Sequence, residues 1–133
     1  MPQIKESEIQ GQIIKYLEIN NCEVVNIVTT GIFDPRTKSF RKAPVKGLAD
    51  IFYSHKHSPL AGWIEVKTPR EYIWTMNQIK RFQNEEGYIK EVLKKKKKKR
   101  LYEQWQFIER MKNTGLTCFF TDGIEKTRDN LKL

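Results

Sequence analysis

Cysteine, histidine and long apolar runs are all scarce in this chain, and each shortage excludes a class of protein. Of its 133 residues, two are cysteine and two are histidine. Cys22 and Cys118 are far apart, with no CxxC pair and no histidine spacing typical of zinc, so we expect two free buried thiols. The N-terminal segment has no apolar signal-peptide core, and no run approaches the roughly 18 apolar residues of a membrane span. The sequence therefore predicts a soluble protein of a reducing, cytoplasmic compartment.

Acidic residues are in the minority, and the excess of positive charge is concentrated in one segment. The chain carries 25 Lys and Arg against 16 Asp and Glu, a formal net charge of +9. Outside the seven consecutive basic residues at 94–100, only 18 basic residues remain against the 16 acids. Such basicity makes nucleic acid and anionic membrane surfaces the partners to consider. The length fits one domain spanning residues 1–133, and no internal repeat is visible.

The order of the predicted elements is typical of an α/β domain. Apolar residues recur at helical spacing from Gln3 to Ile19, and a strand is expected from Cys22, before an exposed loop or hairpin tip at 33–44. GLADIFYS at 47–54 and GWIEVKTP at 62–69 indicate adjacent antiparallel strands. Helical patterns follow after residue 69 and over 101–113, and a short buried strand within 115–122 precedes a ragged tail.

Acidic side chains and a lysine are expected to meet between the two adjacent strands. Glu65 and Lys67 point to one face of their strand because side chains alternate, and Asp50 begins the neighbouring strand. Two converging carboxylates repel unless a cation lies between them, and Mg²⁺ takes such oxygen ligands. A lysine beside that ion could orient or deprotonate water and stabilise charge on a phosphate. The pattern predicts phosphodiester cleavage, although ExK alone more often marks an ordinary ion pair.

Two helices are expected to add polar side chains to the same region. With Glu6 set at 0°, the apolar positions of the first helix fall within about 60° of it, so Glu6 lies in the apolar stripe. Either the acidic site provides its partner, or Glu6 is near enough to the helix start to reach water. Gln104 lies in the buried stripe of the helix over 101–113, whereas Gln78 lies nearer the edge of its own stripe.

An inward Glu, then KGLAD, EVK and a Gln on a following helix together resemble the VRR-NUC family of the PD-(D/E)xK nuclease superfamily. The resemblance runs from about Lys5 to Glu125, and FRKAPVKGLADIF and QFIERMKNTGLTCFF are similar to the surroundings of these motifs in small, stand-alone phage-type members. It implies a restriction-endonuclease-like α/β core, in which a central mixed β-sheet is flanked by helices.

The resemblance also implies an activity and the residues that carry it. The protein would be an Mg²⁺- or Mn²⁺-dependent deoxyribonuclease, a hydrolase acting on ester bonds. Asp50, Glu65 and the backbone carbonyl of Val66 would hold the metal, and Glu6 would complete the acidic cluster. Lys67 would assist the attacking water.

Two residues of this chain could correspond to the glutamine that follows the ExK strand in the family. Gln78 has the usual spacing from Lys67, whereas Gln104 lies 37 residues after that lysine. We prefer Gln104 as the catalytic glutamine because the sequence that follows it is similar to the family's continuation. About 71–100 is then a basic helical insertion.

Two basic groups are expected to contact DNA phosphates. The first precedes the acidic site and could steer a strand into it, and it includes Arg41, Lys42 and Lys46. The second is the basic run, which either neutralises phosphates or is a solvated, mobile loop that orders on DNA. Its members are Lys94, Lys95, Lys96, Lys97, Lys98, Lys99 and Arg100. The three tryptophans are expected in the core or in a dimer contact rather than as platforms for bases.

Taken with these observations, the resemblance implies a metal-dependent DNA endonuclease, structure-specific on branched or Holliday-junction DNA, in the cytoplasm of a bacterial or phage-infected cell. A domain of this size could engage a two-fold symmetric junction only as a homodimer. One alternative is a non-catalytic DNA-binding module, which would not need three acids and a lysine facing inward. Another is a different nuclease of the same superfamily, such as a restriction-type enzyme.

Overall fold

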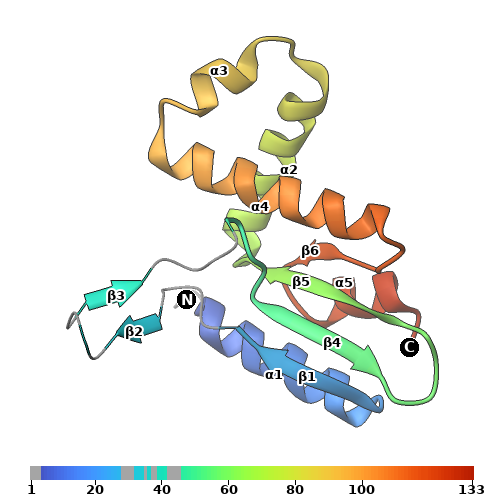
Figure 1. The fold of residues 1–133 in the computed structure, drawn as a ribbon. Coiled ribbons are helices and arrows are strands. Elements are labelled where there is room, and N and C mark those ends of the chain that lie inside the picture. The colour runs from blue at the N-terminus through green and yellow to red at the C-terminus, as the bar shows by residue number, and fades with distance from the viewer. Residues whose placement is uncertain (1–3, 28–31, 35, 37–38, 42–45) are drawn as a thin grey trace.

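The computed structural model describes residues 4–27, 32–34, 36, 39–41 and 46–133 (Figure 1). These residues form both helices and strands, with a mixed sheet between helices, which agrees with the predicted α/β class. Their order is α1 (Glu6–Ile19), β1 (Cys22–Asn26), β2 (Ile32–Asp34), β3 (Ser39–Arg41), β4 (Ile51–His55), β5 (Ala61–Val66), α2 (Pro69–Asn84), α3 (Tyr88–Val92), α4 (Lys96–Asn113), β6 (Phe119–Thr121) and α5 (Ile124–Leu131).

Four of the strands form one mixed sheet in the order β1-β4-β5-β6. β4 pairs antiparallel with both β1 and β5, while β5 and β6 run parallel. The antiparallel pairing of the two central strands was predicted from the sequence and is confirmed. In its register Ile51 faces Ile64, so Asp50, one residue before β4, reaches the level of Glu65.

Helices cover both faces of the sheet, with α1 and α5 on one side and α4 on the other (Figure 1). Ile64 and Val66 of β5 pack with the buried stripe of α1, which consists of Ile9, Ile13 and Leu17. The opposite face packs against α2, α3 and α4 through a cluster that includes Phe82, Phe107 and Phe120. The predicted amphipathic first helix is therefore confirmed, and it begins three residues later than expected, at Glu6.

The segment expected as an exposed loop or hairpin tip contains β3 and the last two residues of β2, and these two strands pair antiparallel in a separate two-stranded sheet. This hairpin lies outside the four-stranded sheet (Figure 1). Residues 28–31, 35, 37–38 and 42–45, on which part of the strand and loop predictions falls, lie outside the described residues.

The basic run differs from the predicted mobile loop, because α4 begins at Lys96 rather than at Leu101. Lysine has a high helix propensity, so the run can continue a helix without apolar periodicity. Tertiary contacts hold it in place: the Lys97 ammonium lies 4.5 Å from the centroid of the Trp74 ring, and that of Lys98 lies 5.4 Å from the Tyr88 ring. The mobile-loop interpretation is therefore wrong for the part of the run from Lys96 onward.

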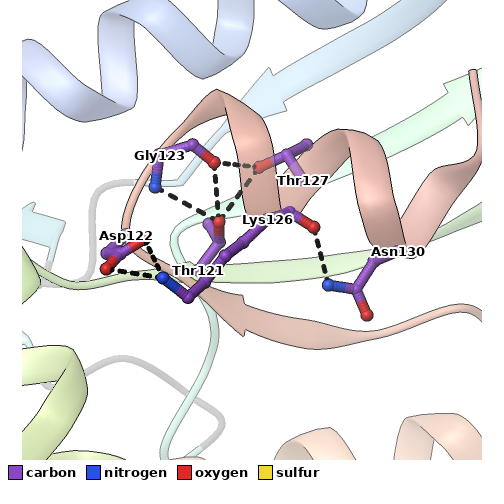
Figure 2. Close-up of polar contacts among 6 residues, drawn as sticks. All are labelled: Thr121, Asp122, Gly123, Lys126, Thr127 and Asn130. Atoms are coloured by element: carbon purple, nitrogen blue, oxygen red, sulfur yellow. Dashed lines mark hydrogen bonds and ion pairs between the residues drawn. The ribbon is translucent and has the colours of Figure 1, made fainter.

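The predicted ragged tail is also wrong, because residues 124–131 form α5 against the sheet. Figure 2 shows the polar contacts at the turn from β6 into this helix. The hydroxyls of Thr121 and Thr127 each donate to the Gly123 carbonyl oxygen at 2.8 Å, and Thr121 Oγ1 also accepts from the Gly123 N–H. The carbonyl of Thr121 in turn accepts from the N–H of Lys67 at 2.9 Å. The turn thus fixes the strand end beside which Lys67 lies.

Two predictions that were based on the scarcity of cysteine and of long apolar runs can be checked in the described part of the chain. Cys22 and Cys118 are free and buried, as predicted. No helix among the described residues combines the length and apolarity that a membrane crossing requires.

Candidate active site

The acids and the lysine singled out in the sequence line one cavity of about 510 Å³, and residues from α1, the sheet, α2 and α4 all contribute to its wall. Its lining consists of Glu6, Gln10, Asn26, Ile27, Asp50, Glu65, Lys67, Glu71, Trp74, Lys97, Arg100, Leu101 and Gln104. Segments that are far apart in the sequence therefore meet here, and carboxylates, ammonium groups and amides share one space.

Asp50 is positioned by the turn that carries the KGLA segment. Gly47 has a φ of 73°, which favours glycine, and a Cβ at this position would lie 2.2 Å from the carbonyl oxygen of Glu103 in α4. The turn can therefore lie directly on the α4 backbone, and Ala49 behind it is fully buried. Asp50 Oδ2 then accepts a hydrogen bond of 2.9 Å from the N–H of Val66, which ties the acid to the end of β5.

Glu65 is the most buried acid of the cavity, with 3% of its surface exposed. Its Oε1 lies 3.7 Å from Lys67 Nζ, whereas its Oε2 is buried without any hydrogen-bond partner. Burial raises the pKa of Glu65 well above the usual 4.5, and the negative charge of Asp50 raises it further, while Lys67 offsets part of this effect. The site therefore holds a carboxylate that its protein surroundings satisfy only in part.

Lys67 follows β5 and shares the face of Glu65, as the alternation of side chains predicted. Its Nζ donates a 2.9 Å hydrogen bond to Gln104 Oε1, and its side chain is 15% exposed. Directly after it, the Thr68 hydroxyl accepts from the N–H of Glu71 and Pro69 occupies the first turn of α2. The TP that follows EVK thus ends the strand and starts a helix, which fixes the backbone on the C-terminal side of the lysine.

The structure brings Gln104 to the site and places Gln78 elsewhere. Gln104 is buried on α4 and accepts the hydrogen bond from Lys67. Gln78 is buried on α2, where its Oε1 accepts from the hydroxyl of Tyr88. Its amide is therefore engaged in packing α2 against α3. That Gln104 fills the role of the family's glutamine remains a prediction.

For Glu6 the sequence left two arrangements open, contact with the acidic site or contact with water, and the structure shows both. It lies in the first turn of α1, is exposed as a residue, and lines the cavity. Partial burial raises the pKa of its carboxyl, and the charge of Asp50 raises it further, whereas Lys67 and Arg100 act in the opposite direction. Glu6 thus reaches solvent and still interacts with the acids at the cavity wall.

The donor set fits a hard divalent ion held by few protein ligands. Among the described residues, no three or more His, Cys, Asp or Glu side chains are grouped so that they could hold a metal ion, so Glu6 does not join the other two acids as a third ligand in this arrangement. Mg²⁺, however, commonly takes one or two carboxylates and keeps several waters. Asp50 and Glu65 supply two carboxylates, and the unpartnered Glu65 Oε2 leaves a coordination position open. Metal binding remains a prediction.

The predicted DNA contacts are only partly described. Of the basic run, Lys97 and Arg100 line the cavity, while Lys98 lies over Tyr88, away from its wall. Lys46 is exposed beside the turn that leads to Asp50. Arg41 ends β3, with nothing described of its side chain, and Lys42 lies outside the described residues.

Sequence reasoning missed two cavity residues because it treated 71–100 as an insertion. Glu71 and Trp74 are three residues apart on the first turns of α2, so they share a helix face. The TP signal after EVK could have located this helix start and hence its inward face. Asn26 was also missed; its Oδ1 accepts from Gln10 Nε2 at 2.8 Å and joins β1 to α1 at the cavity.

Comparisons with family models, with curated proteins and with solved structures find no match for this chain. The resemblance to the VRR-NUC family consequently rests on the motifs themselves and on the arrangement of their residues around one cavity.

Proposed function

We propose that this protein is a metal-dependent DNA endonuclease that hydrolyses phosphodiester bonds. The observation that carries the proposal is the environment of Glu65, which is 3% exposed, is in contact with a second acid, Asp50, lies close to Lys67, and has a buried carboxylate oxygen to which no N–H group is hydrogen-bonded. An ordinary ion pair does not need a second acid or an unsatisfied buried oxygen, since both cost free energy. A site that binds a cation explains both features.

Different residues of the cavity would have different roles in the reaction. A divalent ion held by Asp50 and Glu65 would polarise a phosphate oxygen and lower the pKa of water. Lys67 presents a cation that can orient the attacking water and stabilise negative charge on the phosphate. Gln104 holds the Lys67 ammonium by a 2.9 Å hydrogen bond, which fixes its position beside the acids. Glu6 adds negative charge at the cavity wall, which favours cation binding.

The fold supports a restriction-endonuclease-like core of the VRR-NUC type. The central antiparallel pair carries Asp50 just before β4 and Glu65 on β5, and a parallel strand lies beside β5. Helices cover both faces. The basic first turns of α4 favour a nucleic acid as the phosphodiester substrate, since four lysines and Arg100 lie there without an acid.

A non-catalytic DNA-binding module is the second candidate. The 3.7 Å pair of Lys67 with Glu65 favours it, as does the lack of a three-acid group among the described residues. In such a module the cavity would be structural, and the lysines would hold phosphate.

Cleavage and thermal stability measured on the same variants distinguish the two. We expect wild-type protein to cut DNA with Mg²⁺ or Mn²⁺ and not with excess EDTA. Asp50→Asn, Glu65→Gln and Lys67→Ala should each lower the cleavage rate by about 10²- to 10⁴-fold while the fold is retained. Glu23→Gln, which removes a largely exposed acid on β1, is the matched control. Cleavage in EDTA, or equal cleavage by wild type and Lys67→Ala at matched stability, contradicts the proposal.

We propose branched DNA, including Holliday junctions, as the substrate and a homodimer as the active form. A panel of linear, flapped and four-way-junction DNAs tests the first point. Sedimentation with and without junction DNA tests the second, because two symmetric incisions by a domain of 133 residues call for two copies.

A further inference from the structure

Trp74 stands apart from the other tryptophans of this protein. Trp63 and Trp105 pack in ring clusters, with centroid distances of 5.2 Å from Trp63 to Phe107 and 5.5 Å from Trp105 to Phe82. All three tryptophans are partly exposed, and Trp74 is the one aromatic side chain among the described residues that line the cavity. The core contact predicted for every tryptophan is confirmed for Trp74, which packs against the same cluster as Trp63 and Trp105. Its additional position in the cavity wall beside the acids calls for a further account.

We infer that Trp74 is a stacking platform for an unpaired base of the DNA substrate, next to the phosphate to be cut. The inference deepens the proposed nuclease function and rests on it for the location of that phosphate. It names the substrate class as DNA that presents at least one unpaired nucleotide to the cavity.

The indole face is covered in this structure by a group that a base can displace. Lys97 Nζ lies 4.5 Å from the centroid of the Trp74 ring and 3.4 Å from Glu71 Oε1. The Lys97 side chain is 68% exposed, and an ion pair in such a position is weak because solvent screens it. A base stacked on Trp74 would occupy the place of the ammonium. The flexible Lys97 side chain would then be free to contact the phosphate of the same nucleotide.

The neighbouring cations are arranged for a backbone that passes the platform. Arg100 lies three residues after Lys97 on α4, so both are on one helix face, and both line the cavity. Trp74 thus lines the same cavity as these two cations and the acids. A groove with phosphate-binding cations and an aromatic ring is the combination that binds single strands without base specificity.

The base must be unpaired because a base inside a duplex is already stacked on both faces. An unpaired nucleotide can leave the stack at little cost and offer a free face to an aromatic side chain. A flap, a fork, a junction centre or a single strand would meet this requirement, and a blunt, fully paired duplex would not.

The first test measures DNA binding without metal, so that it does not depend on cleavage. A short single-stranded oligonucleotide and a blunt duplex of the same sequence are titrated by fluorescence anisotropy in EDTA. Trp74→Ala should weaken binding of the single strand by about tenfold, as expected for the loss of one stacked base, and leave duplex affinity within about twofold. Trp74→Phe should retain most of the affinity. Ile73→Ala, a truncation of the adjacent α2 residue that is 64% exposed and outside the cavity lining, should change neither.

Equal losses on single strand and duplex would overturn the inference, because Trp74 would then only shape the cavity. Unchanged binding by Trp74→Ala, or no binding of single strands by the wild type, would overturn it as well. Circular-dichroism melting of each variant identifies any loss that comes from unfolding.

The second test leaves the protein unchanged and removes the base instead. Single abasic positions are introduced one at a time along the single-stranded arm of a flapped duplex, whose branch point fixes the register of binding, and wild-type binding is measured in EDTA. One position should lose about tenfold in affinity, and the same position should show no loss when the protein is Trp74→Ala. A uniform response along the strand overturns the inference. Binding with this signature but without cleavage in Mg²⁺ would refute the nuclease function and leave the stacking site standing.

Discussion

Replacing Glu65 by glutamine should stabilise the metal-free protein while abolishing its chemistry. Glu65 is almost fully buried, its Oε2 has no hydrogen-bond partner, and the negative charge of Asp50 lies close by. Glutamine keeps the shape of the side chain, removes the charge, and provides an amide that can donate to Asp50. Under the proposed function, the acid would be retained at the cost of stability, as is common for active-site groups.

The size of the effect follows from two contributions. A buried polar group without a partner costs about 1–3 kcal/mol, and the substitution relieves part of this. It also removes the attraction between Glu65 and Lys67 at 3.7 Å, but Lys67 keeps its hydrogen bond to Gln104 and its contact with solvent. We expect a net stabilisation of about 1 kcal/mol, or an increase in Tm of about 3–5 °C for a domain of 133 residues.

The difference should depend on pH in a direction fixed by the raised pKa of Glu65. The folded protein binds a proton at Glu65 more tightly than the unfolded chain does, so stability falls as pH rises from 4.5 through the raised pKa. The glutamine variant lacks this loss. Its advantage in Tm should therefore be absent below pH 4.5 and grow toward neutral pH.

Thermal melts in EDTA and in Mg²⁺ check the reasoning. Mg²⁺ should raise the Tm of the wild type by binding the native state, and raise that of Glu65→Gln less or not at all. Glu23→Gln, in which the carboxylate is 76% exposed and pairs with Lys56, should change Tm by little in either buffer. A lower Tm for Glu65→Gln in EDTA would mean that Glu65 serves chiefly as the ion-pair partner of Lys67. That result would favour the non-catalytic DNA-binding module.

Three further variants test the basic run and the turn before Asp50. Replacing Lys94 to Lys99 by serine should weaken the salt dependence of DNA affinity. The slope of log affinity against log salt concentration should fall by about 0.9 for each lost phosphate contact. An unchanged slope would show that the run does not bind the DNA backbone. Gly47→Ala should destabilise the fold by about 2–4 kcal/mol, because Gly47 has a positive φ and lies close to the carbonyl of Glu103. Gly11→Ala should stabilise the fold by about 0.5–1 kcal/mol, because Gly11 lies in α1 with open space around it. Equal melting temperatures of the two variants would contradict this reasoning.

The parts of the fold that carry apolar periodicity were predictable from sequence. The stripe of α1 was identified by spacing alone, since Ile9, Ile13 and Leu17 recur at helical intervals and are all buried. The antiparallel β4–β5 pair was predicted from two short runs of β-forming residues. Alternation along β5 then placed Glu65 and Lys67 on one face, and their 3.7 Å separation confirms that geometry.

The start of α4 and the whole of α5 could not be read from the same signals. Lys96 to Arg100 contain no apolar residue, no side chain caps the helix, and its first turns depend on contacts with rings in α2 and α3. α5 buries only Thr127 and Leu131, so its sequence lacks the apolar stripe on which helix prediction depends. In both cases tertiary packing decides the structure.

The choice between Gln78 and Gln104 shows why spacing along the chain is a poor guide to a site assembled from distant segments. Gln78 lies closer to Lys67 in sequence, yet it is engaged by Tyr88 between two helices. Gln104 reaches Lys67 because Gly47 lets the turn before Asp50 lie against the α4 backbone at Glu103. The glycine of GLAD therefore does more than permit a local turn: the absence of its side chain sets the distance between α4 and the sheet. The acid that follows it and the glutamine across from it are positioned by this one contact.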